Sequence, residues 1–251
     1  MGATQVRLER PSEPFAPATL RIARPEVGNA LSREGAEQLS AAVDLLAAKP
    51  PSGVVLAAEG DRFFCAGGDL EDYRELTDRE SAFAVSLRMQ DVLARLHALP
   101  CLVVCAIEGA AIGGGAELAL ACDLRIAGSQ ATIAMPQSQL GVVLGWGGAA
   151  WLVEAVGRGR AVELLTTGRT VGAGEAAALG LIHTVVPAGH AEPTARAVIG
   201  QAATASPAAV RAVKKVLDPA ASPADVARIF AELWVGDDHR AAEAAWRYRR
   251  R

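Results

Sequence analysis

The sequence predicts an α/β fold in which short buried strands alternate with turns and helices. Two six-residue apolar runs, at 53–58 and 102–107, have the β-branched or small apolar composition of buried strands. Each is followed by a glycine-containing turn and then by a segment compatible with a helix. The chain has 251 residues, of which 51% are apolar, so one α/β unit of this length can bury a sizeable core.

The elements of the first half of the chain are expected in a regular order. Residues 19–23 alternate as an early strand does, and Leu39, Val43 and Leu46 have helical spacing in a segment that Pro50 and Pro51 end. The full order expected is a strand at 19–23, a helix at 31–48, a strand at 53–58, a polar segment at 70–77, a helix at 81–98, and strands at 102–107, 123–127 and 132–135.

From Gly147 onward the pattern becomes mainly helical, with glycines between the segments. We expect helices at 149–156, 161–166 and 174–179, a last strand at 184–187, and four further helices near 192–204, 207–217, 223–235 and 239–250. No repeat of 20–50 residues and no low-complexity linker divides the chain.

The turn Gly113-Gly114-Gly115 lies between the strand at 102–107 and a helix expected at 116–121. Glycines let the backbone approach a ligand closely, and a helix that opens there adds unpaired N–H groups and its positive dipole end. The carboxylate of Glu117 lies in the first helical turn. Three interpretations compete: tight helix packing, a dinucleotide loop, and an oxyanion hole. The dinucleotide loop lacks a clean G-x-G-x-x-G, and no phosphate-loop motif occurs.

A second glycine turn, Ala66-Gly67-Gly68-Asp69, favours the oxyanion hole. It follows the strand at 53–58, as the first turn follows its own strand. Two backbone N–H groups from separate turns can converge on one oxygen and stabilise negative charge that develops on it.

These stretches resemble the crotonase superfamily, the enoyl-CoA hydratase/isomerase family. The resemblance implies an α/β spiral of ββα units at 1–190 that binds and transforms an acyl-CoA, and a C-terminal helical region at 191–251 for packing, oligomerisation and pocket lining. It also implies a homotrimer or dimer of trimers, with coenzyme A as part of the substrate and no separate cofactor or metal. The matching segments, in register from about 18 to 190, are Arg24-Pro25-Glu26-Val27-Gly28-Asn29-Ala30-Leu31-Ser32, Phe64-Cys65-Ala66-Gly67-Gly68-Asp69-Leu70, Gly113-Gly114-Gly115-Ala116-Glu117-Leu118-Ala119, Gly141-Val142-Val143-Leu144-Gly145-Trp146-Gly147-Gly148 and Ala176-Ala177-Ala178-Leu179-Gly180-Leu181-Ile182.

The resemblance assigns roles to particular residues. The backbone amides of Gly68 and Gly114 match the two oxyanion donors, and Glu117 matches the glutamate that activates water or moves a proton. A carboxylate that only interacts with the helix dipole is the alternative for Glu117. Asp69 is either catalytic or a helix cap. The expected substrate-binding residues are Phe64, Cys65, Ala66, Gly67, Asp69, Leu70, Gly113 and Trp146.

Gln137 is the main departure from the family pattern, because it stands where the hydratases have a second catalytic glutamate. A carboxamide donates and accepts hydrogen bonds but is no general acid or base near neutral pH. We therefore expect a lyase that acts through an enolate, either a hydratase or isomerase with one glutamate, which could borrow Tyr73 or His97 as proton carrier, or a decarboxylase of methylmalonyl- or ethylmalonyl-CoA, which needs no base. A non-catalytic acyl-CoA binder is the alternative from another class of function. A likeness to ethylmalonyl-CoA decarboxylase in 145–154 and at Leu233-Trp234 supports the second.

The composition of the chain indicates its cellular compartment and limits the classes of partner that it could bind. The formal charge of −3 gives no indication of a nucleic-acid surface. The cysteines lie in apolar or glycine contexts without C-x-x-C spacing, as expected of free thiols in a reducing cytoplasm. The four histidines show no metal-ligand spacing. Since no signal peptide or uncharged run of about 18 apolar residues occurs, we expect a cytoplasmic protein that binds no membrane.

Overall fold

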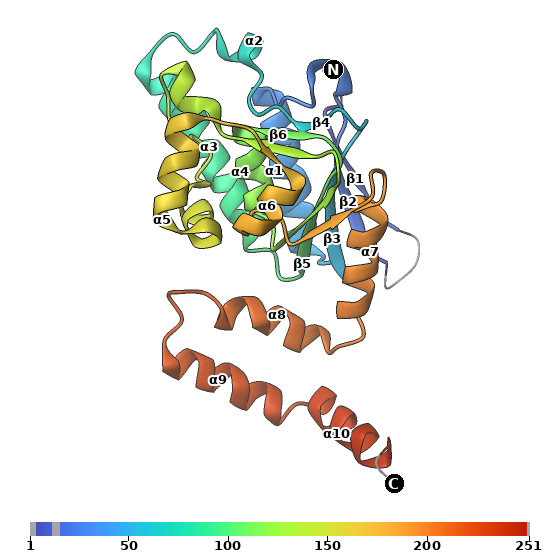
Figure 1. Ribbon diagram of the computed structural model, residues 1–251. Helices are drawn as coiled ribbons and strands as arrows, with labels where there is room; N and C mark the ends of the chain where they lie inside the picture. Colours follow the sequence, from blue (N-terminus) through green and yellow to red (C-terminus); the bar gives the residue numbers. More distant parts are fainter. Residues whose placement is uncertain (1–3, 12–15, 250–251) are drawn as a thin grey trace.

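A computed structural model describes residues 4–11 and 16–249 and shows two β-sheets covered by helices (Figure 1). The larger sheet has six strands in the order β1-β2-β3-β5-β7-β10. Only β1 and β2 are antiparallel, and all other neighbours are parallel. The predicted α/β class is confirmed. The strands are β1 (Val6–Glu9), β2 (Ala18–Ile22), β3 (Gly53–Ala58), β5 (Leu102–Ile107), β7 (Leu124–Gly128) and β10 (Thr184–Val186).

A smaller sheet, in the order β4-β6-β8-β9, is built from very short strands. Each of β4, β6 and β8 comes a few residues after a strand of the larger sheet, so β3–β4, β5–β6 and β7–β8 repeat one step. Helices follow these pairs, which gives the spiral of ββα units that the sequence predicts. The strands are β4 (Phe63–Cys65), β6 (Ala110–Ile112), β8 (Thr132–Ala134) and β9 (Val171–Gly172).

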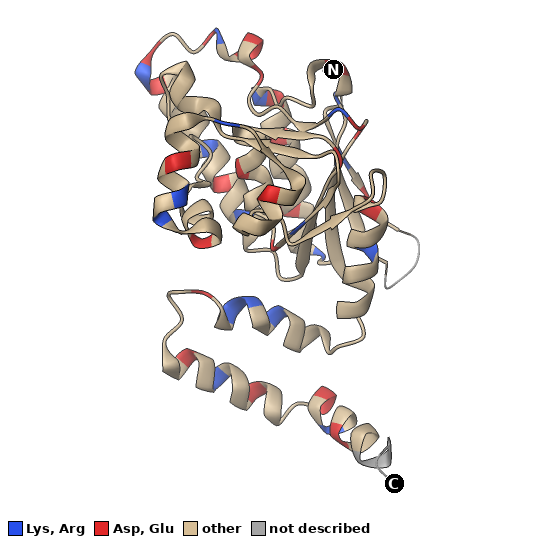
Figure 2. Cartoon of the chain, viewed as in Figure 1, with Lys and Arg blue, Asp and Glu red and all other residues tan. Residues whose placement is uncertain are grey.

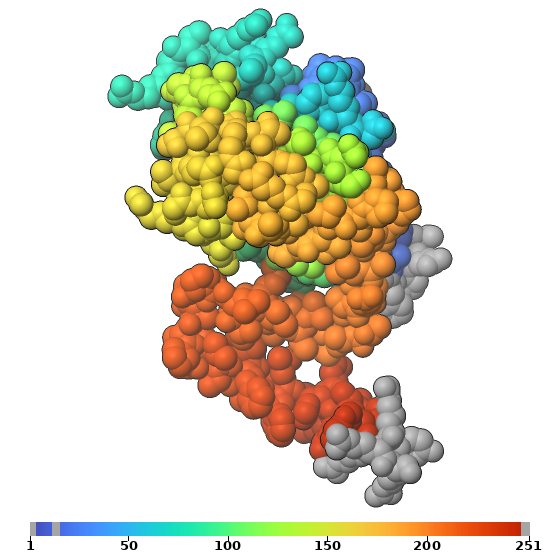
Figure 3. Space-filling model, viewed as in Figure 1, coloured from blue at the N-terminus to red at the C-terminus, as the bar shows by residue number. Residues whose placement is uncertain are grey.

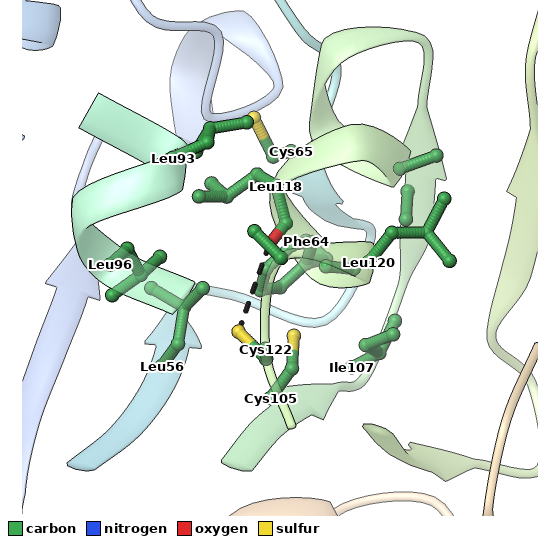
Figure 4. Close-up of a cluster of buried hydrophobic side chains, with 14 of the residues drawn as sticks. Leu56, Phe64, Cys65, Leu93, Leu96, Cys105, Ile107, Leu118, Leu120 and Cys122 are labelled. Carbon is green, nitrogen blue, oxygen red and sulfur yellow. Dashed lines mark hydrogen bonds between the residues drawn. The ribbon is translucent and has the colours of Figure 1, made fainter. Parts of the chain in front are cut away.

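Both faces of the larger sheet are buried, because successive side chains of a strand point to opposite faces. Along β3, Val54 and Leu56 face the main core, whereas Val55 and Ala57 face a second core formed with α7 (Ala191–Ala202). In the main core, side chains of α3 (Arg79–His97) and α4 (Gly114–Leu120) meet those of both sheets (Figure 4). The core fixes the place where α4 begins, next to the site described below.

The remaining helices of the core follow the expected order. The expected break between helices at 149–156 and 161–166 is confirmed, because α5 (Ala149–Thr167) is interrupted at Gly157, whose φ of 75° and ψ of 156° are not helical. The segment at 70–77 contains a four-residue helix, α2 (Leu70–Tyr73). The other elements of the core are η1 (Pro25–Val27), α1 (Arg33–Ala48), η2 (Pro136–Leu140) and α6 (Ala173–Leu179).

The last three helices project away from the sheets (Figures 1 and 3). They are α8 (Pro207–Val216), α9 (Pro223–Trp234) and α10 (Asp237–Arg249). Neither α8 nor α9 buries a residue. Lys and Arg positions colour parts of α8 blue in Figure 2. Lys214 Nζ, at the end of this helix, pairs with Asp123 Oδ1 of the core at 2.9 Å. Among the described residues, no helix has the length and apolarity needed to cross a membrane.

Candidate active site

The two glycine turns predicted from the sequence lie against each other. A side-chain carbon at Gly67, where φ is 94°, would lie 2.9 Å from the backbone nitrogen of Gly114. A side-chain carbon at Gly115 would lie 2.0 Å from the carbonyl oxygen of Cys65. Glycine is therefore required at both positions, because any larger residue would separate the start of α4 from the turn after β4.

The backbone N–H groups of Gly68 and Gly114 are unpaired, within the part of the chain that the structure describes. Around Gly68, the carbonyl of Gly67 accepts from Leu31 and the N–H of Asp69 donates to Leu31, both at 2.9 Å. In such a parallel bridge the N–H of Gly68 itself points away from Leu31. Gly114 is the first residue of α4, so its N–H has no acceptor within the helix. Two free donors thus occur in turns that touch.

Glu117 is almost fully buried, with 1% of its surface exposed, and its carboxylate is held by four N–H donors. Oε2 accepts from the backbone nitrogens of Trp146 and Gly148, each at 2.9 Å. Oε1 accepts from Gly145 N at 3.2 Å and from Gln137 Nε2 at 3.4 Å. Burial raises the pKa of the carboxyl above its ordinary value, and the four donors act in the opposite direction. Since its bonds are longer, Oε1 is the oxygen that a reactant can engage.

Helix α3 holds the turn that binds Glu117. Ser86 Oγ donates to the carbonyl oxygen of Gly145 at 2.6 Å, and Gln90 Nε2 lies 3.4 Å from the same oxygen. A side-chain carbon at Gly148 would lie 2.8 Å from Cγ of Glu117. The glycines of this turn therefore let the backbone close directly around the carboxylate.

Gln137, in η2, completes the surroundings of Glu117. Its Nε2 donates to the carboxylate, whereas its Oε1 is buried and has no hydrogen-bond partner among the described residues. A buried acceptor without a donor is uncommon and often marks a place where a ligand or water completes the bonding. The side-chain nitrogen would also lie 3.5 Å from a carbon placed on Gly113. Gln137, Glu117 and the first glycine turn thus form one cluster.

Aromatic rings cover both glycines whose amides are free. A side-chain carbon at Gly114 would lie 2.7 Å from Cδ2 of Trp146, and one at Gly68 would lie 2.5 Å from Cε2 of Tyr73. Trp146 is buried, with 5% of its surface exposed. Any side chain at either glycine would displace a ring, so the positions of the two rings depend on glycine at 68 and 114.

Asp69 has the capping role that the sequence left open. Its Oδ1 accepts from the backbone nitrogens of Glu71 and Asp72 at the start of α2, and its Oδ2 pairs with Arg24 Nη1 at 2.8 Å. All of its described bonds are structural, so nothing in this geometry presents it as an acid or base.

The other predicted substrate-binding residues divide into three groups. The side chains of Phe64 and Cys65 are buried in the core, where burial raises the pKa of the Cys65 thiol to about 12; only their backbone can face a ligand. Leu70 is 66% exposed beside the site. Ala66 and Gly113 use their N–H groups internally, donating to the carbonyls of Gly28 and Ala134 at 2.9 Å.

His97 makes contacts of a structural kind. Its Nδ1 lies 3.1 Å from the carbonyl oxygen of Ala121, and its ring packs against Trp151 with centroids 5.1 Å apart. Of the two alternative proton carriers, Tyr73 is therefore the one whose ring contacts Gly68, a glycine proposed as an oxyanion donor.

The sequence did not reveal how Glu117 is held. The Gly145-Trp146-Gly147-Gly148 segment was noted as a family landmark, but its amides contact a residue about thirty positions earlier. Its two paired glycines were the available signal, since they permit close backbone approach. No group of three or more His, Cys, Asp or Glu residues that could hold a metal ion occurs within 4–11 and 16–249.

Comparisons with known proteins agree with this fold. Residues 16–242 match the family described as enoyl-CoA hydratase/isomerase, and the chain belongs to that family. It is 38% identical over 198 residues to YngF of Bacillus subtilis, whose name assigns it to the same family, covering 78% of this chain and 76% of YngF. It is 31% identical over 202 residues to the short-chain-enoyl-CoA hydratase of Clostridium acetobutylicum, covering 80% and 77%. The crystal structure of an enoyl-CoA hydratase from Bacillus anthracis superposes with a TM-score of 0.89 at 28% identity, covering 98% and 97%.

Proposed function

We propose that the protein is a lyase that acts on an acyl-CoA thioester through an enolate. The observation that carries this proposal is the pair of amides at Gly68 and Gly114, which have no partner among the described residues and lie in touching turns beside a buried carboxylate. A thioester carbonyl oxygen gains negative charge as the enolate forms, and two N–H donors stabilise that charge. Loss of one such donor raises a barrier by about 3–4 kcal/mol. The enoyl-CoA hydratases among the relatives support the substrate class.

Within this mechanism Glu117 moves a proton or orients water through Oε1. The two short bonds to Oε2 anchor the carboxylate, and the longer bonds to Oε1 can be exchanged for a reactant. The raised pKa brings the carboxyl closer to neutral pH, where a general base works best. Trp146 and Gln137 complete the wall around the reacting carbons.

Decarboxylation of a methylmalonyl- or ethylmalonyl-CoA is the second candidate, and Gln137 is the observation that favours it. Departure of carbon dioxide leaves the enolate without any base. Gln137 is neutral and donates to Glu117, and its buried Oε1 has no partner within the part of the chain that the structure describes. A second glutamate in its place would repel the carboxylate of a malonyl-type substrate, whereas the carboxamide does not.

The proposed assembly is a homotrimer or dimer of trimers in the cytoplasm. Apolar side chains on α8 and α9 are exposed in the single chain, which supports burial against another copy. The four cysteines are free and buried, which supports a reducing compartment.

The test is a mass-spectrometric assay of the purified protein with crotonyl-CoA, a 3-enoyl-CoA, methylmalonyl-CoA and ethylmalonyl-CoA. Loss of carbon dioxide with crotonyl-CoA untouched identifies a decarboxylase. Hydration of crotonyl-CoA identifies a hydratase that works with one glutamate. Gln137→Glu should raise hydration and lower decarboxylation, because it supplies a second carboxylate. Bound coenzyme A without turnover of any thioester would contradict the proposal and indicate a binding protein.

A further inference from the structure

Tyr73 lies directly beside one of the two free amides. It is the last residue of α2, the short helix that Asp69 caps immediately after Gly68. A carbon placed on Gly68 would lie 2.5 Å from Cε2 of Tyr73 and 3.0 Å from Cζ, the ring carbon that bears the hydroxyl group. The hydroxyl end of the ring is therefore in van der Waals contact with the glycine.

The ring occupies a side of Gly68 that leaves the N–H group accessible. In extended backbone the side-chain direction is roughly perpendicular to the plane that contains the N–H and C=O bonds. The carbonyl of Gly67 and the N–H of Asp69 are bonded to Leu31, so the N–H of Gly68 points the opposite way. The ring of Tyr73 lies in this perpendicular, side-chain direction from Gly68. An oxygen that accepts a hydrogen bond from the Gly68 N–H would thus lie next to the tyrosine ring.

The hydroxyl group of Tyr73 has no structural role in the described part of the fold. Its oxygen is buried and makes no hydrogen bond of normal geometry with any described residue. Burial raises the pKa of Tyr73 to about 12, although the neighbouring Trp146 side chain acts in the opposite direction. The group is therefore protonated at neutral pH, and it is an unused O–H donor inside the site.

The site also lacks an evident second proton donor. Gln137 has no acidic proton, and Glu117, which removes a proton or orients water through Oε1 in the mechanism proposed above, is already the base of the reaction. An enolate must nevertheless take up a proton at the α-carbon before the product can leave, whether it arises by addition or by decarboxylation.

We propose that the hydroxyl of Tyr73 delivers this proton to the α-carbon, an inference that rests on the enolate function proposed above. The O–H bond breaks, the electron pair of the enolate forms the new C–H bond, and the thioester carbonyl is restored. The buried phenolate oxygen regains its proton from water that enters the site as the product leaves. Proton transfer from a positioned side chain accelerates a step by about 10²–10⁴-fold.

The experiment compares the wild type with Tyr73→Phe in D2O. Phenylalanine keeps the ring on Gly68 and removes only the O–H group. The substrate is whichever of crotonyl-CoA or methylmalonyl-CoA the wild type converts, and the readouts are kcat, KM and the configuration of deuterium at the α-carbon by NMR. Tyr248→Phe is the matched control, because the chain contains two tyrosines and this one is in α10.

We expect the wild type and Tyr248→Phe to place deuterium on one face of the α-carbon. Tyr73→Phe should lose about 100-fold or more in kcat, with little change in KM, and should give both configurations. A slower Tyr73→Phe enzyme that still deuterates one face would overturn the inference, because the hydroxyl would then only hydrogen-bond the substrate. Full activity of Tyr73→Phe would overturn it as well. Failure of the wild type on every thioester would instead reject the proposed function itself.

Discussion

The carboxylate of Glu117 is surrounded by donors of two kinds, and they respond differently to substitution. Three are backbone amides of the turn at 145–148, which no side-chain replacement removes. The fourth is the side-chain amide of Gln137, which can be deleted cleanly. Because a donor stabilises the charged form, its loss must raise the pKa of the carboxyl further above the ordinary value.

This difference predicts the pH dependence of Gln137→Leu. If the carboxylate form of Glu117 is the active one, kcat/KM falls as the pH drops through its pKa. The midpoint of that acid limb should move to higher pH in the variant, and a pH–rate profile measures it. Ser138→Ala is the control on the same short helix, since Ser138 donates to the Leu165 carbonyl and does not contact Glu117. An acid limb that stays in place or moves to lower pH would contradict the prediction.

The two glycines proposed to form the oxyanion hole, Gly68 and Gly114, should tolerate no side chain. In Gly114→Ala the new methyl group would lie 2.7 Å from Trp146, and in Gly68→Ala it would lie 2.5 Å from Tyr73. We expect each variant to lose about 100-fold in kcat, because the ring or the amide must shift from its position. Gly200→Ala in α7 meets no atom within 4 Å and should keep full activity while gaining about 0.5–1 kcal/mol of stability. Wild-type kinetics in Gly114→Ala would exclude its amide from the reaction.

Among the elements, α2 is the smallest and carries Tyr73. A four-residue helix gains little from its own hydrogen bonds, so its N-cap contributes much of its stability. Asp69→Ala removes both the cap and the ion pair with Arg24, whereas Asp69→Asn keeps a good capping side chain. Urea unfolding should show a loss of about 1–2 kcal/mol for the alanine variant and clearly less for the asparagine variant. Equal losses would assign the stabilising role to the ion pair.

The elements also show how far the sequence determines the fold. The strands at 53–58 and 102–107 were predictable, because six apolar residues in a row are a sufficient signal. The three-residue strands β4 and β6 were not, because so few residues define no period and their pairing joins distant segments. The glycines at 67, 68, 113 and 114 were found because their motif is local. The turn that holds Glu117 and the ring of Tyr73 on Gly68 depend on tertiary contacts.

On the scale of the whole molecule, α8 and α9 form a helical arm with little contact to its own core. The rings of Phe230 and Trp234 stack with centroids 5.4 Å apart, yet they are 62% and 56% exposed. Leu217 is 72% exposed. An apolar surface of this kind on a separate arm is typical of a contact between subunits. It also gives a reason why the chain, which has a core of its own, carries two helices in 207–234 that bury no residue.

The arm predicts the effect of a single charge on assembly. Phe230→Glu places a carboxylate at the centre of the exposed aromatic pair, where burial against a second copy would be costly. Sedimentation velocity should show the wild type as a trimer or a dimer of trimers and the variant as smaller species. Leu45→Glu is the matched control, because Leu45 is 58% exposed on α1, outside the arm. A wild type that sediments as a monomer would contradict the prediction, and so would a Phe230→Glu variant of unchanged mass. If the assembly dissociates while turnover per chain persists, the site at Glu117 is complete within one chain; if turnover falls in parallel, the arm also shapes the acyl pocket of another copy.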